Sequence, residues 1–521
     1  MNAVTRPRRK LPIGIQTFAE IRQENHYYVD KTPQILRLID EGKYYFLSRP
    51  RRFGKSLLLD TIAELFEGNR ALFEGLHADA HWDWSRQFPV IRISFSDGVL
   101  RSQPALEQKT RELLSAQQKR HGIECHNTSI SGWFAELIQE LHQRCGERVV
   151  VLIDEYDKPI LDNLTEPDVA RAMRDGLRDL YSVLKGQDAH IKFTLLTGVS
   201  KFSKVSLFSG LNNLTDITVD KAYSALCGYT DADVDQIFAP ELPGLDRDEI
   251  RRWYNGYNWT GTSVYNPFDL LLLFRNREFK SYWFETGTPT FLVDLLAERQ
   301  AWLPELGQLE TDAELLSAFD VDYIATEALM FQAGYLTIAE VINLGDTYFY
   351  RLRYPNREVE QSLNNRLLMR WMPEGTSSVK RRMSLYQRLQ ANDFAGLREL
   401  FTAFFASIPN DWYRSNRIAQ YEGYYASVFY SHFAALGLEI RLEDVTNRGR
   451  IDMTVLFNRQ VYLFEFKVVE LVPQGRALQQ IRERGYADKY RARGEPIHLI
   501  GVEFSREQRS VVGFEVESWA P

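Results

Sequence analysis

Residues that could bind a phosphate lie in the segment YYFLSRPRRFGKSLLL, residues 44–59. Gly54 would let a phosphate approach the backbone, Lys55 would contact its oxygens as a point charge, and the Ser56 hydroxyl would bind Mg²⁺. The helix that follows would direct its first N–H groups at the same anion. The full pattern G-x-x-x-x-G-K-[ST] begins with glycine, whereas this chain has Arg49 there. The segment therefore predicts a phosphate-binding loop, and a basic loop that only caps a helix is the alternative.

Two adjacent carboxylates, Asp154 and Glu155, follow the apolar run VVVLI at 149–153. In hydrolysis of a nucleoside triphosphate, one acid holds Mg²⁺ and a second can orient the attacking water. We assign the first role to Asp154 and the second to Glu155. Solvated acids at a strand end are the alternative, although a buried strand more often ends in a turn residue. Asp157, which precedes Lys-Pro, is predicted to be a helix N-cap without a chemical role.

A third strand, KFTLLT at 192–197, carries polar residues at and beyond its end. Strands beside a phosphate-binding loop commonly place a polar group near the terminal phosphate. Thr197 or Ser200 could do this here, and helix capping is the alternative. Together with the loop and the acid pair, this strand predicts binding of a nucleotide with Mg²⁺, while hydrolysis depends on Glu155 alone.

A second set of acids with a lysine lies near the C-terminus. Residues 451–467 predict a β-hairpin with Asp452 and Glu465 on adjacent strands, and the strand period of two places Glu465 and Lys467 on one face. Such carboxylates could hold Mg²⁺ or Mn²⁺ against a scissile phosphodiester, while the lysine orients the attacking water and offsets negative charge. Glu422, on an upstream aromatic helix, could add a third carboxylate. The alternative is an exposed strand face with a cross-strand ion pair, although Asp, Glu and Lys are disfavoured in such apolar strands.

Downstream of this hairpin, residues 474–493 form a predicted basic helix. Charge runs are usually solvated faces, but beside a site that cleaves phosphodiesters the same face could follow a nucleic-acid backbone. The candidate contacts are polar and basic side chains of this helix, namely Gln480, Arg482, Arg484 and Lys489.

The composition of the 521-residue chain is that of a globular, multidomain protein, with 44% hydrophobic and 26% charged residues. A net charge of −7 excludes a chain that coats nucleic acid as a whole, so any such contact must come from a local patch. Three separated cysteines without a CxxC pair favour a reducing cytoplasm over a disulfide scaffold or a zinc site. Neither a signal peptide nor a membrane span is expected.

Apolar strands that alternate with amphipathic helices predict a parallel sheet with helices on both faces in the first part of the chain. The predicted strands are 44–47, 90–95, 149–153 and 192–197, and the helices include 57–66 and 130–143. From 229 to 371 the pattern is mostly helical, and the segment 373–375 is the best linker candidate. A β-rich segment at 438–467, the basic helix and a last strand at 497–504 close the chain.

These motifs together resemble the AAA-ATPase-like proteins of bacteria and archaea. The matching segments are Ile13–Gln16, Tyr28–Thr32, Arg49–Ser56, Leu152–Asp157, Leu196–Ser200, Trp253–Tyr257, Tyr265–Pro267 and Gly334–Ile338. In that family an arginine-containing loop at positions 49–52 is usual. The resemblance implies that the chain binds ATP, with Arg52 and Phe53 as further nucleotide-binding residues, and cores of this kind frequently assemble into homo-oligomers.

The tail of the chain resembles the PD-(D/E)XK nuclease-like domain that often ends proteins of this family. The matching residues are Glu422, Gly449–Asp452, Glu465–Lys467 and Gln480–Ile481. The whole resemblance implies an α/β fold in three parts: a P-loop NTPase parallel sheet with helices on both faces, a mostly helical, winged-helix-like middle region, and a restriction-endonuclease-like α/β domain. We place these parts at residues 1–228, 229–375 and 376–521.

We therefore expect a cytoplasmic, NTP-regulated, Mg²⁺-dependent nuclease that acts on DNA or RNA, with defence against foreign nucleic acid as its role. ATP at Lys55 and Ser56, with Mg²⁺ held through Asp154, would set the arrangement of the core and the lid. The alternative is a nucleotide-dependent switch that binds nucleic acid or a protein partner without cutting it. A motor that moves along DNA is a third hypothesis, although no feature of the sequence indicates translocation.

Overall fold

The computed structural model describes residues 8–201, 213–287, 292–293, 296, 309–312, 316, 319–320, 323–345, 347–371, 375–406 and 422–520. These residues form two compact units. Unit 1 comprises the described residues within 1–287 and 309–356, and unit 2 comprises those within 288–308 and 357–521. The three-part division at 228 and 375 stays a prediction, and of the predicted linker 373–375 only Gly375 is described, as the first residue of a helix.

Unit 1 is built on a parallel sheet with the strand order β2-β3-β4-β1-β5. The strands are β1 (Tyr44–Ser48), β2 (Val90–Ser94), β3 (Val149–Asp154), β4 (Ile191–Gly198) and β5 (Thr215–Asp216). Nearly every residue of β1, β3 and β4 is buried, which is why these strands appear in the sequence as continuous apolar runs. The predicted strands and their parallel arrangement are confirmed, and β5 is an addition.

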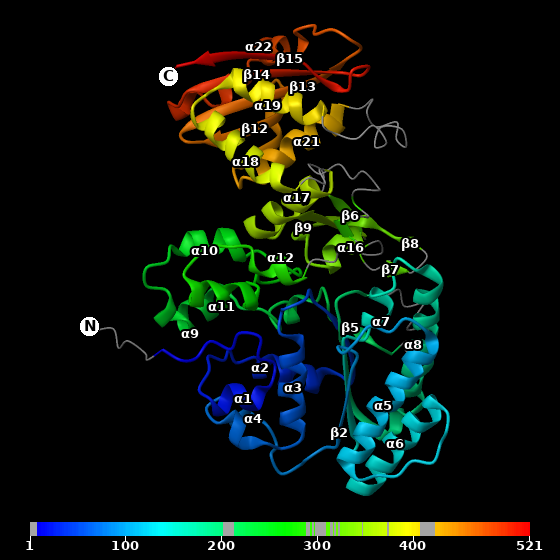
Figure 1. Ribbon diagram of the computed structural model, residues 1–521. Helices are drawn as coiled ribbons and strands as arrows, with labels where there is room; N and C mark the ends of the chain where they lie inside the picture. The colour runs from blue at the N-terminus through cyan, green and yellow to red at the C-terminus, as the bar shows by residue number, and fades with distance from the viewer. Residues whose placement is uncertain are drawn as a thin grey trace, which may run out of the picture. The chain divides into compact units, whose positions relative to one another are not determined.

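Helices cover both faces of this sheet (Figure 1). α3 (Lys55–Phe66) packs on β3 and β4 from one side, whereas α5 (Gln103–His121), α6 (Ile130–Cys145) and α8 (Pro167–Gly186) lie on the other. Right-handed crossovers produce this arrangement, because the connection from β1 to β2 runs along the sheet in the opposite direction to the next two connections. The carboxyl ends of β1, β3 and β4 consequently lie beside the N-terminus of α3.

The remaining helices of unit 1 lie before β1, between the sheet elements, and in the region after β5. They are α1 (Phe18–Gln23), α2 (Thr32–Glu41), α4 (His77–His81), α7 (Lys158–Leu161), α9 (Asp231–Ile237), α10 (Arg247–Tyr254), α11 (Pro267–Asn276), α12 (Tyr282–Gly287) and α16 (Thr326–Gln332). The helical character predicted for the middle region is confirmed, but this region also contains β-structure that the sequence pattern did not predict.

That additional structure is an antiparallel sheet with the order β6-β10-β9, together with a short strand pair. Its strands are β6 (Glu310–Asp312), β9 (Thr337–Leu344) and β10 (Thr347–Arg353), and the pair is β7 (Phe319–Asp320) with β8 (Tyr323–Ile324). Most of β9 is exposed, so it lacks the continuous apolar run by which the buried strands were predicted.

Unit 2 contains a mixed sheet with the order β11-β12-β13-β14-β15. The strands are β11 (Glu439–Thr446), β12 (Gly449–Phe457), β13 (Gln460–Val469), β14 (Ile497–Ser505) and β15 (Ser510–Trp519). Only β13 and β14 pair in parallel, and α22 (Arg476–Arg484) connects them. The other described helices of the unit are α17 (Arg357–Trp371), α18 (Gly375–Gln390), α19 (Phe394–Ala406) and α21 (Glu422–Ala434).

The two faces of this sheet are covered by different kinds of side chain. Aromatic rings of α21 pack on β13, with Phe433 lying 5.3 Å from Phe464 between ring centroids. Aliphatic residues of α22, including Leu478 and Ile481, pack with Leu463 in a separate buried cluster. The sheet is therefore enclosed by α21 on one face and α22 on the other, so that side chains near the C-terminal end of β13 meet α22.

Two predictions for the C-terminal part were wrong in extent. The predicted basic helix 474–493 ends at Arg484, because Gly485 adopts a left-handed backbone (φ 59°), and two 3₁₀ turns at Tyr486–Lys489 and Arg491–Arg493 follow. The predicted last strand is followed by β15, an edge strand of mixed burial whose apolar residues alternate with acids and serines.

Candidate nucleotide and nuclease sites

The loop between β1 and α3 has the backbone geometry of an anion site. Arg52 (φ 69°) and Gly54 (φ 89°) both adopt left-handed conformations, and Gly54 is the residue that precedes α3. A Cβ atom placed on Gly54 would have no neighbour within 4 Å, so open space lies beside this glycine. The loop can therefore accept an anion at the N-terminus of α3 without moving a side chain.

Arg49, at the position where the common pattern has glycine, turns away from this space. Its guanidinium is buried and donates hydrogen bonds to the carbonyl oxygens of Thr218 at 2.8 Å and Tyr223 at 3.1 Å. It also lies 4.0 Å from the ring centroid of Trp259, and burial lowers its pKa to about 10. The arginine thus anchors the loop to later segments of unit 1, which explains why its bulk is compatible with a phosphate-binding loop.

Lys55 lies beneath the loop. Its ammonium group donates to the carbonyl oxygens of Arg49 at 2.9 Å and Pro50 at 3.0 Å, and the residue is only 7% exposed. Burial lowers the pKa of Lys55, and the charges of Asp154 and Glu155 partly oppose that shift. The charge of Lys55 has no carboxylate within ion-pair distance among the described residues, so it remains available to an external anion.

The predicted metal-binding residues converge on Asp154. One carboxylate oxygen, Oδ2, accepts a hydrogen bond from the Ser56 hydroxyl at 2.5 Å, and Oδ1 accepts one from the Thr197 hydroxyl at 2.7 Å. The structure thus brings together residues from α3, β3 and β4. A carboxylate with adjacent hydroxyls is a set of hard oxygen donors, which fits Mg²⁺.

Glu155 follows Asp154 in an unusual backbone conformation for a non-glycine residue, with φ of 50°. Its side chain lines the same cavity as Lys55. Burial, and then the negative charge of Asp154, raises the pKa of Glu155 above its usual value. A carboxylate with such a raised pKa is a stronger base than an exposed glutamate, as a water-activating group requires.

Asp157 and Ser200 form a separate contact behind this cluster. Asp157 precedes α7, but its carboxylate does not cap that helix. Its Oδ2 accepts hydrogen bonds from the backbone N–H of Val199 at 3.0 Å and from the N–H and hydroxyl of Ser200, each at 2.6 Å. Asp157 is therefore the N-cap residue of α7, as predicted, but its side chain makes no capping hydrogen bond and instead holds the segment that follows β4. Of the two polar candidates, Thr197 contacts Asp154 and Ser200 contacts Asp157.

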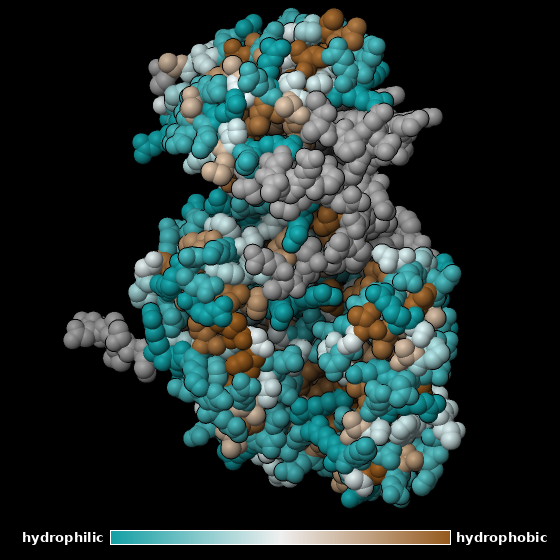
Figure 2. Space-filling model, in the orientation of Figure 1, coloured by the Kyte–Doolittle hydropathy of each residue, from teal (hydrophilic) through white to brown (hydrophobic). Residues whose placement is uncertain are grey.

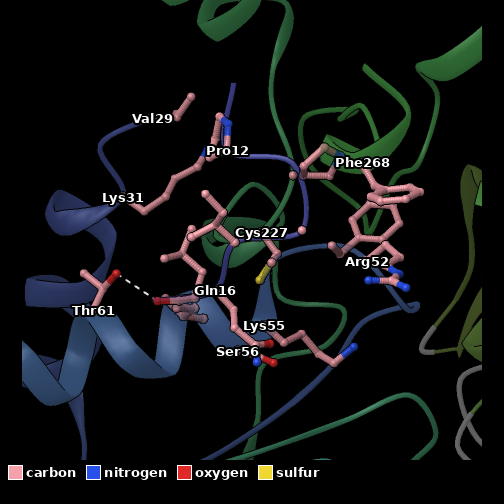
Figure 3. Close-up of a pocket in the computed structure, with 18 of the residues that line it drawn as sticks. Pro12, Gln16, Val29, Lys31, Arg52, Lys55, Ser56, Thr61, Cys227 and Phe268 are labelled. Carbon is pink, nitrogen blue, oxygen red and sulfur yellow. Dashed lines mark hydrogen bonds between the residues drawn. The ribbon is translucent and has the colours of Figure 1, made fainter. Parts of the chain in front are cut away.

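A cavity of about 430 Å³ extends from this loop toward the N-terminal segment (Figure 3). Besides Arg52 to Ser56, it is lined by residues to which the sequence analysis gave no role: Gln16, Tyr28, Lys31, Cys227, Tyr229 and Phe268. The Tyr28 hydroxyl lies 3.4 Å from that of Thr61 on α3. The family-like segments around Gln16 and Tyr28 were a signal for these residues, but their position over α3 depends on tertiary contacts.

In unit 2, a two-residue turn fixes the β12–β13 hairpin. Asn458 and Arg459 both have positive φ values, 51° and 57°, and Phe457 pairs directly with Gln460. The ladder continues to Met453 opposite Phe464. Asp452 follows at this end, and its Oδ2 accepts a hydrogen bond from the backbone N–H of Phe466 at 2.7 Å.

Glu465, Lys467 and Gln480 meet next to Asp452. The side chain of Glu465 is fully buried, and its Oε1 lies 3.3 Å from the ammonium nitrogen of Lys467. The same oxygen accepts a hydrogen bond from the Gln480 amide on α22. Gln480, assigned from sequence to nucleic-acid binding, thus contacts a predicted catalytic acid. Tyr486, which the sequence analysis missed, lies beside this group, and burial followed by the charge of Glu465 raises its pKa.

The described carboxylates that could hold a metal in unit 2 are those of Asp452 and Glu465. Glu422 begins α21, but the placement of its side chain lies outside what the structure describes. Within the described residues no cluster of three or more His, Cys, Asp or Glu side chains could hold a metal ion. Two carboxylates with one lysine still match the hard-oxygen chemistry of Mg²⁺, which commonly keeps several water ligands.

The remaining nucleic-acid candidates of the basic segment differ in their contacts. Arg482 forms an ion pair with Glu517 at 2.5 Å, and Lys489 pairs with Asp444. Arg484 instead donates a hydrogen bond to the carbonyl oxygen of Arg448 at 3.0 Å.

Comparisons with known proteins agree with the resemblance drawn from the motifs. Residues 12–208 match the family model described as a predicted AAA-ATPase, and residues 420–514 match that of the PD-(D/E)XK nuclease superfamily. The chain therefore belongs to the AAA-ATPase-like proteins that carry a C-terminal PD-(D/E)XK nuclease-superfamily domain. It is 68% identical over 512 residues to an uncharacterized protein in the vnfD 5′ region of Azotobacter chroococcum mcd 1. The aligned region covers 98% of this chain and 99% of that protein.

Among the described helices, none combines the length and the apolar character needed to cross a membrane. The molecular face seen in Figure 2 is mostly hydrophilic, with apolar residues in scattered groups.

Proposed function

We propose that this protein is an ATP-regulated, Mg²⁺-dependent nuclease that cleaves phosphodiester bonds in DNA or RNA. The observation that carries the proposal is the contact of Glu465 with Lys467 and Gln480, next to Asp452, in a unit distinct from the nucleotide site. A chain with two separate sites for phosphate chemistry suits an enzyme in which ATP bound at one site controls the cleavage of nucleic acid at the other. Defence against foreign nucleic acid is the role we propose for this activity.

In unit 1, the β1–α3 loop would hold the phosphates of ATP and the cavity would hold the rest of the nucleotide. Lys55 would neutralise phosphate oxygens, and Ser56 with Asp154 would bind Mg²⁺. Glu155 would accept a proton from the attacking water, to which its raised pKa is suited.

In unit 2, Asp452 and Glu465 would hold the divalent ion. When bound, that ion would supply Lewis-acid stabilisation of the phosphodiester and lower the pKa of a bound water. Lys467 would orient the water and offset negative charge, while Gln480 would keep the carboxylate of Glu465 in place. The acids are already held by the protein's own groups, Asp452 by the backbone N–H of Phe466 and Glu465 by the side chains of Lys467 and Gln480.

Regulation by nucleotide is supported by contacts that the middle helices of unit 1 make with the phosphate-binding loop and with the segment after β4. The indole N–H of Trp283 on α12 donates to the carbonyl oxygen of Arg51 at 3.0 Å. The backbone N–H of Lys201, after β4, donates to the Gln332 side chain on α16 at 2.8 Å. A change of the loop on nucleotide binding would therefore reach α12, and a change at the end of β4, where Thr197 contacts Asp154, would reach α16.

Cleavage assays on labelled single- and double-stranded DNA and RNA, with and without ATP and with Mg²⁺ or Mn²⁺, test the proposal. We expect cleavage that needs the metal and responds to ATP, and we expect Asp452→Ala to abolish it. Glu470→Ala, a change of an exposed acid beyond β13, is the matched control and should cut as the wild type does. Cleavage by Asp452→Ala at the wild-type rate would refute the assigned site.

The second candidate is a nucleotide-dependent switch that binds nucleic acid or a protein partner without cutting. It is favoured by the absence of a three-ligand cluster among the described residues and by the engagement of Glu465 with Lys467 and Gln480. Calorimetry distinguishes the two functions. Uptake of Mg²⁺ or Mn²⁺ that is lost in Glu465→Gln supports the nuclease, whereas no metal uptake at this site supports the switch.

A further inference from the structure

We infer that Arg448 and Arg484 form a phosphate clamp beside Asp452 and Glu465, and that the backbone of the nucleic-acid substrate is its partner. The inference rests on the proposed nuclease function and identifies the surface that holds the substrate of that site. It replaces the broader expectation that the whole basic segment contacts nucleic acid.

Most cations of residues 476–493 are already neutralised within unit 2. The ion pairs are Arg482–Glu517 at 2.5 Å, Lys489–Asp444, Arg491–Asp488 at 3.0 Å and Arg493–Glu495 at 2.6 Å. Among the described residues, Arg476 and Arg484 of this segment have no carboxylate within ion-pair distance. A phosphate would have to break an existing pair to bind the first group of cations, but it would find Arg476 and Arg484 available.

Arg484 is held next to a second unpaired arginine from another element. Its Nη1 donates to the backbone oxygen of Arg448 at 3.0 Å, in the turn between β11 and β12. The Thr446 hydroxyl braces that turn by accepting from the Arg448 N–H at 3.2 Å and donating to the Gly449 oxygen at 3.0 Å. The side chain of Arg448 extends over α22's end, since its Nη1 would lie 3.0 Å from a Cβ on Gly485.

The two guanidinium groups therefore gather at one exposed place without an ion pair in the described part of the chain. Of the nearby acids, Glu483 accepts from Gln479, and Asp488 pairs through Oδ1 with Arg491 while its Oδ2 lies near the Arg448 side chain, beyond ion-pair distance. Two positive charges that are held close together repel one another and are stabilised by an anion. Because guanidinium groups bind phosphate oxygens in a planar, two-point manner, phosphate is the anion that this arrangement fits.

The clamp lies beside the proposed catalytic acids through Tyr486. A Cβ on Gly449 would lie 2.8 Å from the Tyr486 hydroxyl oxygen, so the turn that carries Arg448 touches this tyrosine. The same tyrosine is within electrostatic range of Glu465, Arg484 and Asp452. A nucleic-acid backbone that presents one phosphate to the acids would thus place a neighbouring phosphate near the arginines.

The experiment measures binding of fluorescein-labelled DNA and RNA strands and duplexes by anisotropy, with Ca²⁺ in place of Mg²⁺ to separate binding from cleavage. We expect Arg448→Ala and Arg484→Ala each to weaken binding roughly three- to tenfold, and each to reduce the slope of log affinity against log salt by about one. Arg484→Lys, which keeps the charge but not the two-point geometry, should weaken binding less than Arg484→Ala. Arg493→Ala removes an exposed arginine already paired with Glu495 and should bind as the wild type does.

The outcomes separate the clamp from the function on which it rests. Wild-type affinity and salt slope in both Arg448→Ala and Arg484→Ala would overturn the clamp, even if the protein binds and cuts nucleic acid. A wild-type protein that binds none of the probes would overturn the nuclease function itself. Because both arginines are exposed, unchanged thermal unfolding of the variants is expected, and it would exclude misfolding as the cause of lost binding.

Discussion

The two sites use the same residue types but place them on different kinds of sheet. In unit 1, Asp154 and Glu155 are neighbours at the end of a parallel strand, where hydroxyls from two other elements hold Asp154. In unit 2, Asp452 and Glu465 come from antiparallel strands and are bound by a backbone N–H and by side chains. In the parallel sheet, the polar groups meet where the strands end. In the hairpin, they meet because two residues of neighbouring strands lie opposite each other. The second site consequently depends on strand register in a way that the first does not.

The lysines of the two sites differ in their partners. Lys55 is buried and donates to neutral carbonyl oxygens, so its full charge is available to an incoming phosphate. Lys467, with a side chain 25% exposed, already pairs with Glu465 of its own site. The first lysine is arranged to bind a ligand, and the second is arranged to act together with an acid.

Replacing the proposed base of unit 1 should separate the two activities most strongly. We expect Glu155→Gln to reduce ATP turnover about 10²- to 10⁴-fold, since a general base contributes that much, while ATP binding and ATP-stimulated cleavage by unit 2 persist. Phosphate release, nucleotide binding and strand cleavage are the measurements. Glu124→Gln, an exposed change, is the control. ATP turnover by Glu155→Gln at the wild-type rate would show that another group activates the water.

Removing the buried lysine should have the next largest effect. Lys55→Ala is expected to weaken ATP binding by about 2–5 kcal/mol, the usual loss when one partner of a buried charged contact is deleted. Calorimetric titration with ATP measures this loss, with Lys119→Ala at an exposed helix end as the control. Metal-dependent cleavage should persist in Lys55→Ala but should no longer respond to ATP. ATP binding of wild-type strength would exclude Lys55 from the phosphate site.

A third variant tests unit 2 alone. The buried carboxylate of Glu503 on β14 accepts the backbone N–H groups that precede and begin α22, those of Gln474, Gly475, Arg476 and Ala477. Glu503→Gln should lower the free energy of unfolding by about 1–3 kcal/mol, because hydrogen bonds to a charged acceptor are the stronger kind. Urea unfolding followed in unit 2 measures it, and the exposed Glu507→Gln is the control. Loss of ATP binding in Glu503→Gln would contradict the separation of the sites.

The smallest predicted effect concerns the pH dependence of stability. The folded-state pKa of Glu155 lies above its usual value, so the contribution of this group is most favourable below the unfolded-state pKa and is lost as pH rises through the folded-state pKa. Glu155→Gln, which is neutral at every pH, should therefore be slightly more stable than the wild type near neutrality and equal to it in acid. Melting temperatures across that pH range check this. A Glu155→Gln variant that is less stable than the wild type near neutrality, by a deficit that disappears in acid, would mean that the pKa is depressed.

The sequence predicted those parts of the molecule that depend on local pattern. Buried parallel strands such as β3 are continuous apolar runs, and their ends located Asp154 without knowledge of any contact. The exposed strand β9 and the edge strand β15 lack such runs and were missed. The prediction extended the basic helix past Gly485, because the helical pattern is judged over many residues and one left-handed residue changes it little.

The partners of individual site residues were harder to predict, because they come from elements far apart in the chain. Nothing near Arg49 indicates that its side chain stacks on Trp259. Gln480 was grouped with the cations around it, although its amide contacts Glu465. Residue type predicted the chemistry proposed for each site, whereas only the folded chain shows which side chains contact one another.

The two-residue turn of Asn458 and Arg459 sets the register of β12 against β13 in unit 2. Both residues already occupy the left-handed conformation that a two-residue connection demands, so the loop has no slack to absorb a change in length. One extra amino acid inserted there could leave the sheet intact and yet shift β12 by a single step against β13, which would send Asp452 to the far side of the layer from Glu465. If unit 2 cleaves nucleic acid as proposed, natural variation in the length of this connection should consequently be rare among relatives with the same activity.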